Sequence, residues 1–130
     1  MCAVKAARAE ATSQQAVGVK AFSRIATAWG LDAARTAKLA DVAPRTWARM
    51  AAGEWKGELT HDQTLRLSAL VGVYKALHLY FSDELADRWP TLPNAGPLFL
   101  GSKPVDMMVS GGLPAIMDVR DYVDAVRGGM

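Results

Sequence analysis

The sequence predicts an all-α protein, and three observations support this fold class. Apolar residues recur at spacings of three and four along most of the 130-residue chain, which is the period of a helix with one buried face. Runs of alternating β-branched residues bounded by turns, which would indicate strands, are nearly absent. Glycines and prolines divide the chain into segments of helical length. The length suits one compact domain, or two very small domains that share a core.

The first predicted helix covers residues 17–29. Gly30 follows it and can end a helix in the left-handed backbone conformation. Residues 1–15 are rich in Ala, Gln, Ser and charged residues, so they are interpreted as a tail or a marginal helix. The inner face of the predicted helix consists of Val19, Phe22, Ile25, Ala26 and Trp29.

Two short helices and a tight turn are predicted next. Asp32 can cap a helix over residues 33–40 by accepting a hydrogen bond from its first turn. After a turn at 41–43, Pro44 suits the first position of another helix, because the N–H that proline lacks has no helical partner there. Gly53 ends this helix. Two short helices joined by a three-residue turn predict a helix-turn-helix motif.

A long helix is predicted to start after Thr60. Gln63 lies three residues further on, which completes a capping-box pattern, and an apolar stripe continues for about five turns. A shorter helix is expected over residues 84–89, closed by Pro90. The stripe of the long helix consists of Leu67, Leu70, Val71, Tyr74, Leu77 and Phe81.

The remaining residues predict a linker and two more helices. Residues 90–102 hold three prolines and two glycines and are expected to form the linker. A short helix over 103–109 should be broken by Gly111 and Gly112, and the last helix is predicted over 113–127. Its inner face consists of Leu113, Ile116, Met117, Val119, Val123 and Val126.

Charge is distributed unevenly between the two halves. Residues 1–60 contain nine basic and five acidic residues, a net charge of +4. Residues 61–130 contain six basic and eight acidic residues, a net charge of −2. A basic front half and an acidic back half suggest two surfaces that meet different partners.

Several function classes are disfavoured. Cys2 is the only cysteine, so an intramolecular disulfide is excluded. His61 and His78 lack the spacing of metal ligands, and no Ser/His/Asp or Cys/His arrangement is visible, so we expect no catalytic residue, metal or cofactor. The first twenty residues lack the apolar core of a signal peptide, and the most apolar stretch, residues 65–81, is interrupted by charges. We therefore expect a non-enzymatic cytoplasmic protein without membrane association.

The helix that starts at Pro44 is the candidate reading helix for DNA. In a helix-turn-helix protein this helix enters the major groove, where side chains near its N-terminus reach base edges. Arg45 and Arg49 lie four residues apart on one helical face. Arg45 could read guanine, and Thr46 could bind a phosphate or touch a thymine methyl. Three further contacts are expected with phosphates, from Arg35, Arg49 and Lys56.

The same pattern has a plainer interpretation. A helical bundle with solvated arginines would also show two short helices and a turn, so the motif leaves DNA binding open. In either case Trp47 occupies the inward position of its helix, and we expect it in the core rather than against bases.

The back half carries the more specific pattern. Residues 98–109, LFLGSKPVDMMV, are followed by Gly111-Gly112 and by a final helix over 119–128. This stretch resembles the toxin-binding domain of Xre/MbcA/ParS antitoxins. Residues 86–89, with a tryptophan, and residues 39–53 of the helix-turn-helix are similar to the same family. The resemblance covers roughly residues 17–129.

The resemblance implies a domain organisation and partners. Residues 1–16 would be a tail, 17–82 an Xre-like helix-turn-helix domain and 83–130 a toxin-binding domain. Members of the family are antitoxins encoded beside RES-domain toxins, which consume NAD, or beside related ADP-ribosylating toxins. They obstruct the toxin active site, and many bind their own operator. One departure is Ala43 before Pro44, where DNA-binding relatives often place Ser or Thr as the cap.

Contacts with the toxin and a second copy are also expected. Arg and Tyr are favoured anchors of protein interfaces, so the candidate toxin-binding residues are Lys103, Arg120, Tyr122 and Arg127. A homodimer is expected because single helix-turn-helix units bind DNA weakly. The alternative function is a stand-alone helix-turn-helix regulator whose C-terminal part only dimerises.

Overall fold

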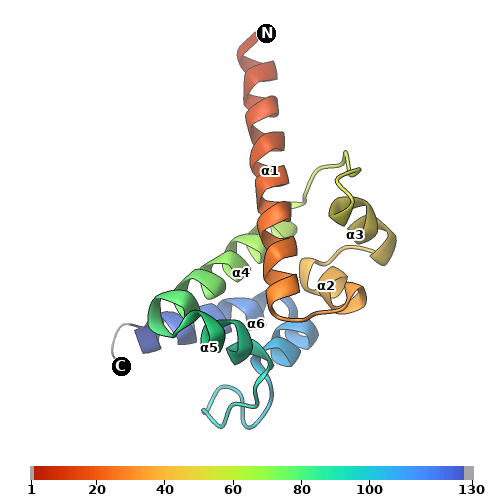
Figure 1. Ribbon diagram of the computed structural model, residues 1–130. Coiled ribbons are helices and arrows are strands. Elements are labelled where there is room, and N and C mark those ends of the chain that lie inside the picture. Colours follow the sequence, from red (N-terminus) through yellow and green to blue (C-terminus); the bar gives the residue numbers. More distant parts are fainter. Residues whose placement is uncertain (1, 128–130) are drawn as a thin grey trace.

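The protein is all-α over the residues described by the computed structural model (Figure 1). The backbone is described for residues 2–127 and the side chains for residues 14–126. No strand occurs in that part of the chain, so the predicted fold class is confirmed. The elements are α1 (Cys2–Ala28), α2 (Ala33–Ala40), α3 (Pro44–Ala51), α4 (His61–Tyr80), α5 (Asp83–Arg88), the 3₁₀ helix η1 (Trp89–Thr91) and α6 (Pro104–Arg127).

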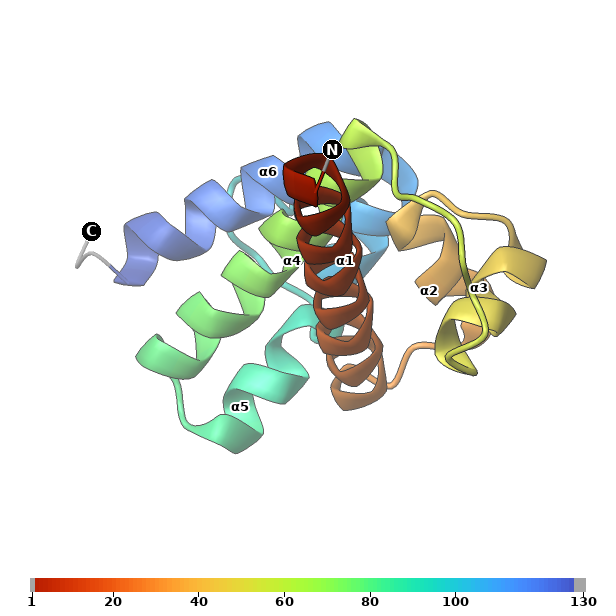
Figure 2. The same cartoon turned by 90° about the horizontal axis from the view of Figure 1, so that it is seen from above.

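The long helix α4 is the centre of the arrangement. It packs against α6 along one side and against α1 on another (Figures 1 and 2). The small helices α2 and α3 lie together beside α1, and α5 follows the far end of α4. Because α6 also contacts α2, the C-terminal part of the chain returns to the helix-turn-helix.

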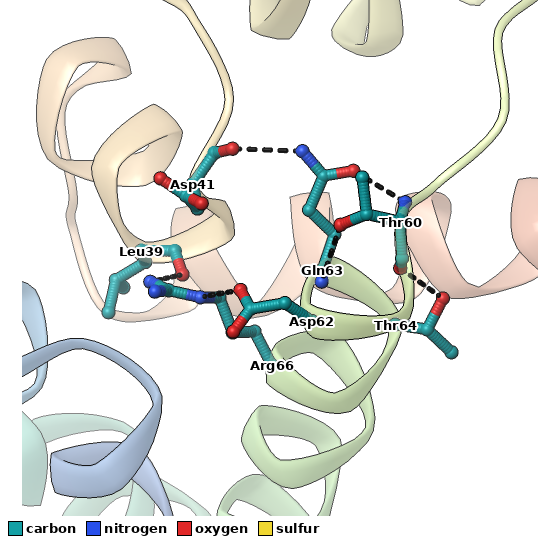
Figure 3. Close-up of polar contacts among 7 residues, drawn as sticks. All are labelled: Leu39, Asp41, Thr60, Asp62, Gln63, Thr64 and Arg66. Carbon is teal, nitrogen blue, oxygen red and sulfur yellow. Dashed lines mark hydrogen bonds and ion pairs between the residues drawn. The ribbon is translucent and has the colours of Figure 1, made fainter.

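The predicted helix ends are confirmed by their caps. Gly30 has φ +69° after α1, and the Asp32 carboxylate accepts a hydrogen bond from the Arg35 N–H at 2.8 Å. At the start of α4 the capping box is complete: the Gln63 N–H donates to Thr60 Oγ1 at 3.1 Å, and the Thr60 N–H donates to Gln63 Oε1 at 2.9 Å (Figure 3). These contacts satisfy backbone donors that the helix itself cannot.

The beginning of the chain is helical. Of the two alternatives for residues 1–15, a tail or a marginal helix, the backbone from Cys2 onward is a helix continuous with the predicted one over 17–29. The predicted inner face of that helix is buried, with Phe22 only 1% exposed.

Helix α4 is buried on two sides, which its apolar stripe alone did not indicate. Leu67, Leu70 and Leu77 of the predicted stripe are buried, but its other three members are only partly buried. Small residues and one valine on a neighbouring face are buried as well: Ala69, Val73 and Ala76. A helix between two partners needs both faces apolar, and short side chains let the second partner approach closely.

Helix α6 contains the predicted glycine break. Gly112 has φ 70° and ψ −153°, which is not helical, and it divides the element into a short and a long part. The inner-face prediction was wrong at Met117, which is 39% exposed, because the buried face instead runs through Ala115, Ile116 and Val119. Met117 follows Ile116 directly, so it lies about 100° around the helix from the buried face.

The linker also differs from its expected form. Pro90 lies inside the 3₁₀ helix Trp89–Thr91, so the helical path continues past the proline that was expected to close it. Of two adjacent apolar residues in this segment, Phe99 is 3% exposed whereas Leu100 is 84% exposed. The loop therefore inserts one aromatic side chain into the core and leaves its neighbour in solvent.

One hydrophobic core extends through both predicted domains. Its buried residues run from Val19 in α1 to Val123 in α6, and α4 contributes to both parts. The limits 17–82 and 83–130 stay a prediction, but the helices on either side of residue 82 share their packing. No helix in the described part of the chain is long and apolar enough to cross a membrane.

Candidate functional site

The helix-turn-helix motif is fixed by its turn. Asp41 begins the turn with a left-handed backbone (φ 57°, ψ 49°), which Asp adopts more readily than most residues. The Val42 N–H donates to the Ala37 carbonyl at 3.0 Å, and Val42 packs against the core. From α4, Gln63 donates through Nε2 to the Asp41 carbonyl at 2.9 Å (Figure 3). The angle between α2 and α3 is therefore held by both α2 and α4.

Helix α3 has one buried face and one free face. Trp47 and Met50 are buried, and the Trp47 ring meets Phe22 edge-on with 5.3 Å between ring centroids. The prediction that Trp47 is a core anchor is confirmed. Arg45 and Arg49 are both exposed. The Phe22–Trp47 contact thus anchors α3 against α1, while the two guanidinium groups on the opposite face of α3 are open to solvent.

The start of α3 is open in a way that suits phosphate. Ala43 makes no side-chain cap and Pro44 has no N–H, so the remaining N–H groups of the first turn are offered to an external acceptor. Thr46 in this turn is half-buried. Lys56 is exposed in the segment between α3 and α4. Four of the five predicted DNA contacts therefore belong to α3 and the segment after it.

The fifth predicted contact, Arg35, is bound to the C-terminal half. Its Nη2 forms an ion pair with Asp106 Oδ1 in the first turn of α6. Both side chains are partly exposed, 37% for Arg35 and 53% for Asp106. DNA phosphate would compete with this carboxylate for the guanidinium. The pair could not be predicted from sequence, because its members are 71 positions apart.

Arg66 joins three elements, and the sequence interpretation had treated it only as a break in an apolar stretch. Its side chain is 14% exposed, with Nε donating to Asp62 Oδ2 at 2.6 Å. Nη1 donates to the Leu39 carbonyl near the end of α2 at 3.4 Å (Figure 3). A Cβ on Gly112 would lie 3.2 Å from Nη2. Arg66 therefore connects α4, the end of α2 and the kink of α6.

Tyr122 belongs to an aromatic cluster that fixes the loop before α6. Its ring stacks near Trp89 with centroids 6.3 Å apart and meets Phe99 edge-on at 5.0 Å. A Cβ on Gly96 would come within 3.0 Å of its hydroxyl, so the loop passes close to the ring. Tyr122 is half-buried and also lines a groove of about 220 Å³ between α4, η1 and α6. Most of the Tyr122 ring is therefore packed against other residues, and one side of the ring faces this groove.

The other predicted toxin contacts are not gathered at one point. The Arg120 side chain packs over Gly72 of α4, since a Cβ added at Gly72 would lie 2.8 Å from Arg120 Nε. The same nitrogen is 3.9 Å from Asp124 Oδ2. Lys103 is exposed just before α6. Arg127 is the last residue of α6, and its side chain lies outside the described ones. The candidates thus follow the whole length of α6.

His78 is held between two carboxylates at the end of α4. Its Nδ1 is 2.9 Å from Asp83 Oδ1 and its Nε2 is 2.8 Å from Asp87 Oδ1, both in α5. Burial lowers the pKa of His78, but the two hydrogen bonds and the negative charges outweigh this and raise the pKa above its ordinary value. The Tyr74 ring lies 4.2 Å away, and burial with the same carboxylates raises its pKa. The arrangement fastens α5 to α4.

The described side chains contain no cluster of three or more His, Cys, Asp or Glu that could hold a metal. His61 is exposed at the start of α4, far along that helix from His78. Features suited to binding lie elsewhere on the described surface: exposed arginines on α3, the uncapped start of that helix and the apolar groove beside Tyr122.

A helix-turn-helix with a buried aromatic anchor and exposed arginines defines a DNA-binding class of protein. Within it, residues 8–72, half of the 130-residue chain, match the family model of the antitoxin Xre-like helix-turn-helix domain. The chain belongs to this family. The match covers α2, α3 and parts of α1 and α4, and therefore identifies the front half that the sequence predicted less specifically.

A curated relative matches over more of the chain. The chain is similar to the uncharacterized protein y4oB of Sinorhizobium fredii, with 37% identity over 115 residues, covering 85% of this chain and 84% of that protein. No solved structure gave a significant match. The toxin-binding resemblance of the back half thus stays a prediction.

Proposed function

We propose that this protein is a type II antitoxin that neutralises an NAD-degrading toxin of the RES type and represses its own operon. The observation that carries the proposal is membership of the antitoxin Xre-like family over a helix-turn-helix whose reading helix is rigid and free. Such a protein regulates by binding and has no need of catalysis. Both partners, operator DNA and the toxin, place its action in the cytoplasm.

The DNA-binding part of the proposal rests on α3. Arg45 would meet base edges, while Arg49, Thr46 and Lys56 would meet the backbone, because the exposed face of α3 and its uncapped start are the parts available to a groove. Arg35 would join them only after leaving Asp106. The net charge of +4 over residues 1–60 favours this side for a polyanion.

The toxin-binding part rests on α6 and the groove beside it. Lys103 and Arg120 offer charge along the helix, and Tyr122 lines an apolar groove whose other walls come from α4 and η1. An aromatic-lined groove with flanking charges has the composition of a protein interface. We propose that docking there obstructs the toxin active site, in line with the resemblance of the back half.

Co-expression with the neighbouring gene product tests the antitoxin function. If that product is a RES-domain toxin, its expression alone should deplete cellular NAD and stop growth, and expression with this protein should restore both. A tagged copy of this protein should retain the toxin through washing. A neighbour that neither binds nor becomes harmless would overturn the proposal.

A stand-alone transcriptional regulator is the second candidate. The observation that favours it is the shared core: α6 packs along α4 and contacts α2, so the back half has a structural role of its own. Genome position separates the two functions. A neighbouring gene for a small RES-type protein favours the antitoxin, and its absence favours the regulator.

A further inference from the structure

The first half of α1 extends beyond the rest of the protein. With 27 residues and a rise of about 1.5 Å per residue, the helix is roughly 40 Å long. Its buried residues start at Val19, and among the described side chains the first to hydrogen-bond another element is Gln15, which accepts from the Leu59 N–H at 3.1 Å. Figures 1 and 2 show the preceding turns standing clear of the other helices.

A projecting helical segment gains stability from a packing partner. The segment continues a helix that is already nucleated, but most helical stability in proteins comes from tertiary packing of one face rather than from helix propensity. Residues 2–13 contain Ala at five positions and one Val, so the sequence offers short side chains that allow a close helix–helix approach. The segment is therefore suited to lie against an apolar surface.

Such a surface lies where the projecting segment begins. A groove of about 340 Å³ runs between α1 and α4. Its lining combines the apolar side chains of Leu59, Leu67 and Val71 with Gly18 and with polar residues, Gln14, Gln15, Thr64 and Ser68. A Cβ on Gly18 would meet nothing within 4 Å, so the floor of the groove is open. At neighbouring positions of the same two helices, Val17 is 66% exposed and Leu65 is 39% exposed.

We propose that this protein forms a two-fold dimer in which residues 2–13 of each copy dock into the α1–α4 groove of the other. Each copy carries one projecting segment and one groove, so a single two-fold axis satisfies both, as an isologous interface requires. The segment ends where Gln14, Gln15 and Gly18 of its own helix line the groove. In such a dimer we therefore expect the two α1 helices to cross close to their middles.

The dimer deepens the proposed function, because two reading helices related by a two-fold axis match a palindromic operator. The interface itself does not depend on DNA. No residue of α6 lines this groove, so we expect the toxin-binding surface proposed above to stay available in the dimer.

Replacement of Gly18 by Arg tests the interface in the full-length chain. A Cβ at this position meets nothing within 4 Å, so we expect the side chain to extend into the groove, leaving the fold intact while the partner segment is expelled. We expect at least a tenfold weaker dimer by sedimentation velocity across a dilution series. The matched control is Ala28→Arg, at the exposed far end of the same helix, which should leave the dimer intact.

Two outcomes would overturn the interface: a wild-type protein that is monomeric at micromolar concentration, or a G18R variant that dimerises as wild type. Far-UV circular dichroism and thermal melting show whether G18R is folded. If it is not, thiol crosslinking decides. In a Cys2→Ser background, Ala7→Cys with Ser68→Cys should crosslink between copies, whereas Ala7→Cys with Glu84→Cys should not. No crosslink in the first pair contradicts the docking.

The same variants separate this inference from the proposed function. A folded, monomeric G18R protein should still bind and neutralise the toxin but bind a palindromic operator more weakly. If wild type dimerises through the groove yet binds no operator, the interface stands and the DNA-binding function fails. If wild type binds operator while G18R binds equally well as a dimer, the interface fails and the function stands.

Discussion

Arg35 in the first helix of the helix-turn-helix forms an ion pair with Asp106 in the first turn of α6. The pair joins the proposed DNA-binding and toxin-binding parts of the protein directly. Because both side chains are partly exposed, the pair contributes less than about 1 kcal/mol to stability. Its larger consequence is competition, since a guanidinium held by a carboxylate is not available to a phosphate.

Asp106→Asn should therefore strengthen operator binding. It frees Arg35 and removes a negative charge, so we expect about two- to tenfold tighter binding and a salt dependence steeper by up to about 0.9 in log–log slope, the value of one phosphate contact. Fluorescence anisotropy at several salt concentrations measures both. Asp118→Asn removes the same charge from an exposed position of α6. If the two variants have equal effects, the tighter binding comes from the lost negative charge and not from the release of Arg35.

Replacing Arg45 and Arg49 together by Ala should weaken operator binding without affecting the fold. Both side chains are exposed, so the free energy of unfolding should change by less than about 0.5 kcal/mol. Loss of one base contact and one phosphate contact should cost at least about tenfold in affinity. The control Lys75→Ala/Arg88→Ala removes two exposed cations from α4 and α5. Unchanged affinity in the first variant would mean that α3 does not read DNA.

Lys103→Ala/Arg120→Ala should weaken toxin binding and leave operator binding unchanged. Lys103 is exposed, and Arg120 is partly exposed over Gly72, so truncation opens no core cavity. Arginine is enriched among the interface residues whose truncation costs more than about 1 kcal/mol, which is at least about fivefold in the dissociation constant. Calorimetry with the purified toxin measures it. Tyr122 is a poorer choice for this test, because its loss would also disturb the aromatic cluster. If the variant binds the toxin as tightly as wild type, these two charged side chains do not contribute to the interface.

His78→Gln should flatten the pH dependence of stability. A pKa raised on folding means that the charged imidazole stabilises the fold fully below its unfolded-state pKa, about 6.5. That stabilisation is lost as the pH rises through the higher folded-state pKa. Wild type should therefore lose free energy of unfolding above about pH 6.5 relative to the variant. Urea unfolding across this range measures it, and His61→Gln, at an exposed position, serves as the control. Parallel curves for wild type and H78Q would contradict the role of the two carboxylates.

Gly112→Ala should destabilise the protein. At φ 70° and ψ −153° the backbone is in a region that is essentially restricted to glycine, and the added Cβ would lie 3.2 Å from Arg66 Nη2. We expect a loss of about 1–3 kcal/mol in the free energy of unfolding. Ser110→Ala, two positions earlier on an exposed part of the helix, should change it by less than about 0.5 kcal/mol. A neutral G112A variant would show that the kink can relax into a straight helix.

Local signals in the sequence were sufficient for the helices and their ends. Asp32, Thr60 with Gln63, and Pro44 act on backbone groups within three or four residues, so their effects could be predicted without knowledge of the fold. The helix-turn-helix follows from the same local rules. Trp47 could be assigned to the core because its helix is short and has one apolar face.

Contacts between distant segments could not be predicted in this way. The burial of Ala69 and Val73 depends on α6 reaching α4, and the exposure of Met117 depends on how α6 is rotated against it. Arg66 and His78 looked like interruptions of an apolar helix. Arg66 nevertheless binds Asp62 of its own helix and the Leu39 carbonyl of α2, and His78 lies between two carboxylates of α5. The Asp62–Arg66 spacing of four was the one local signal for the first of these contacts.

The sequence by itself determined the all-α class, the helix ends that carry a local cap and the exposed face of α3, because these depend on hydrogen bonds and periodicity within a few residues. Only the tertiary structure decided that Arg35 is held by Asp106, that the kink at Gly112 meets Arg66, and that one core extends through both halves. These relationships join residues far apart in the chain. They arise because α6 folds back along α4 to bury its apolar face, and that burial places its first turn beside the helix-turn-helix.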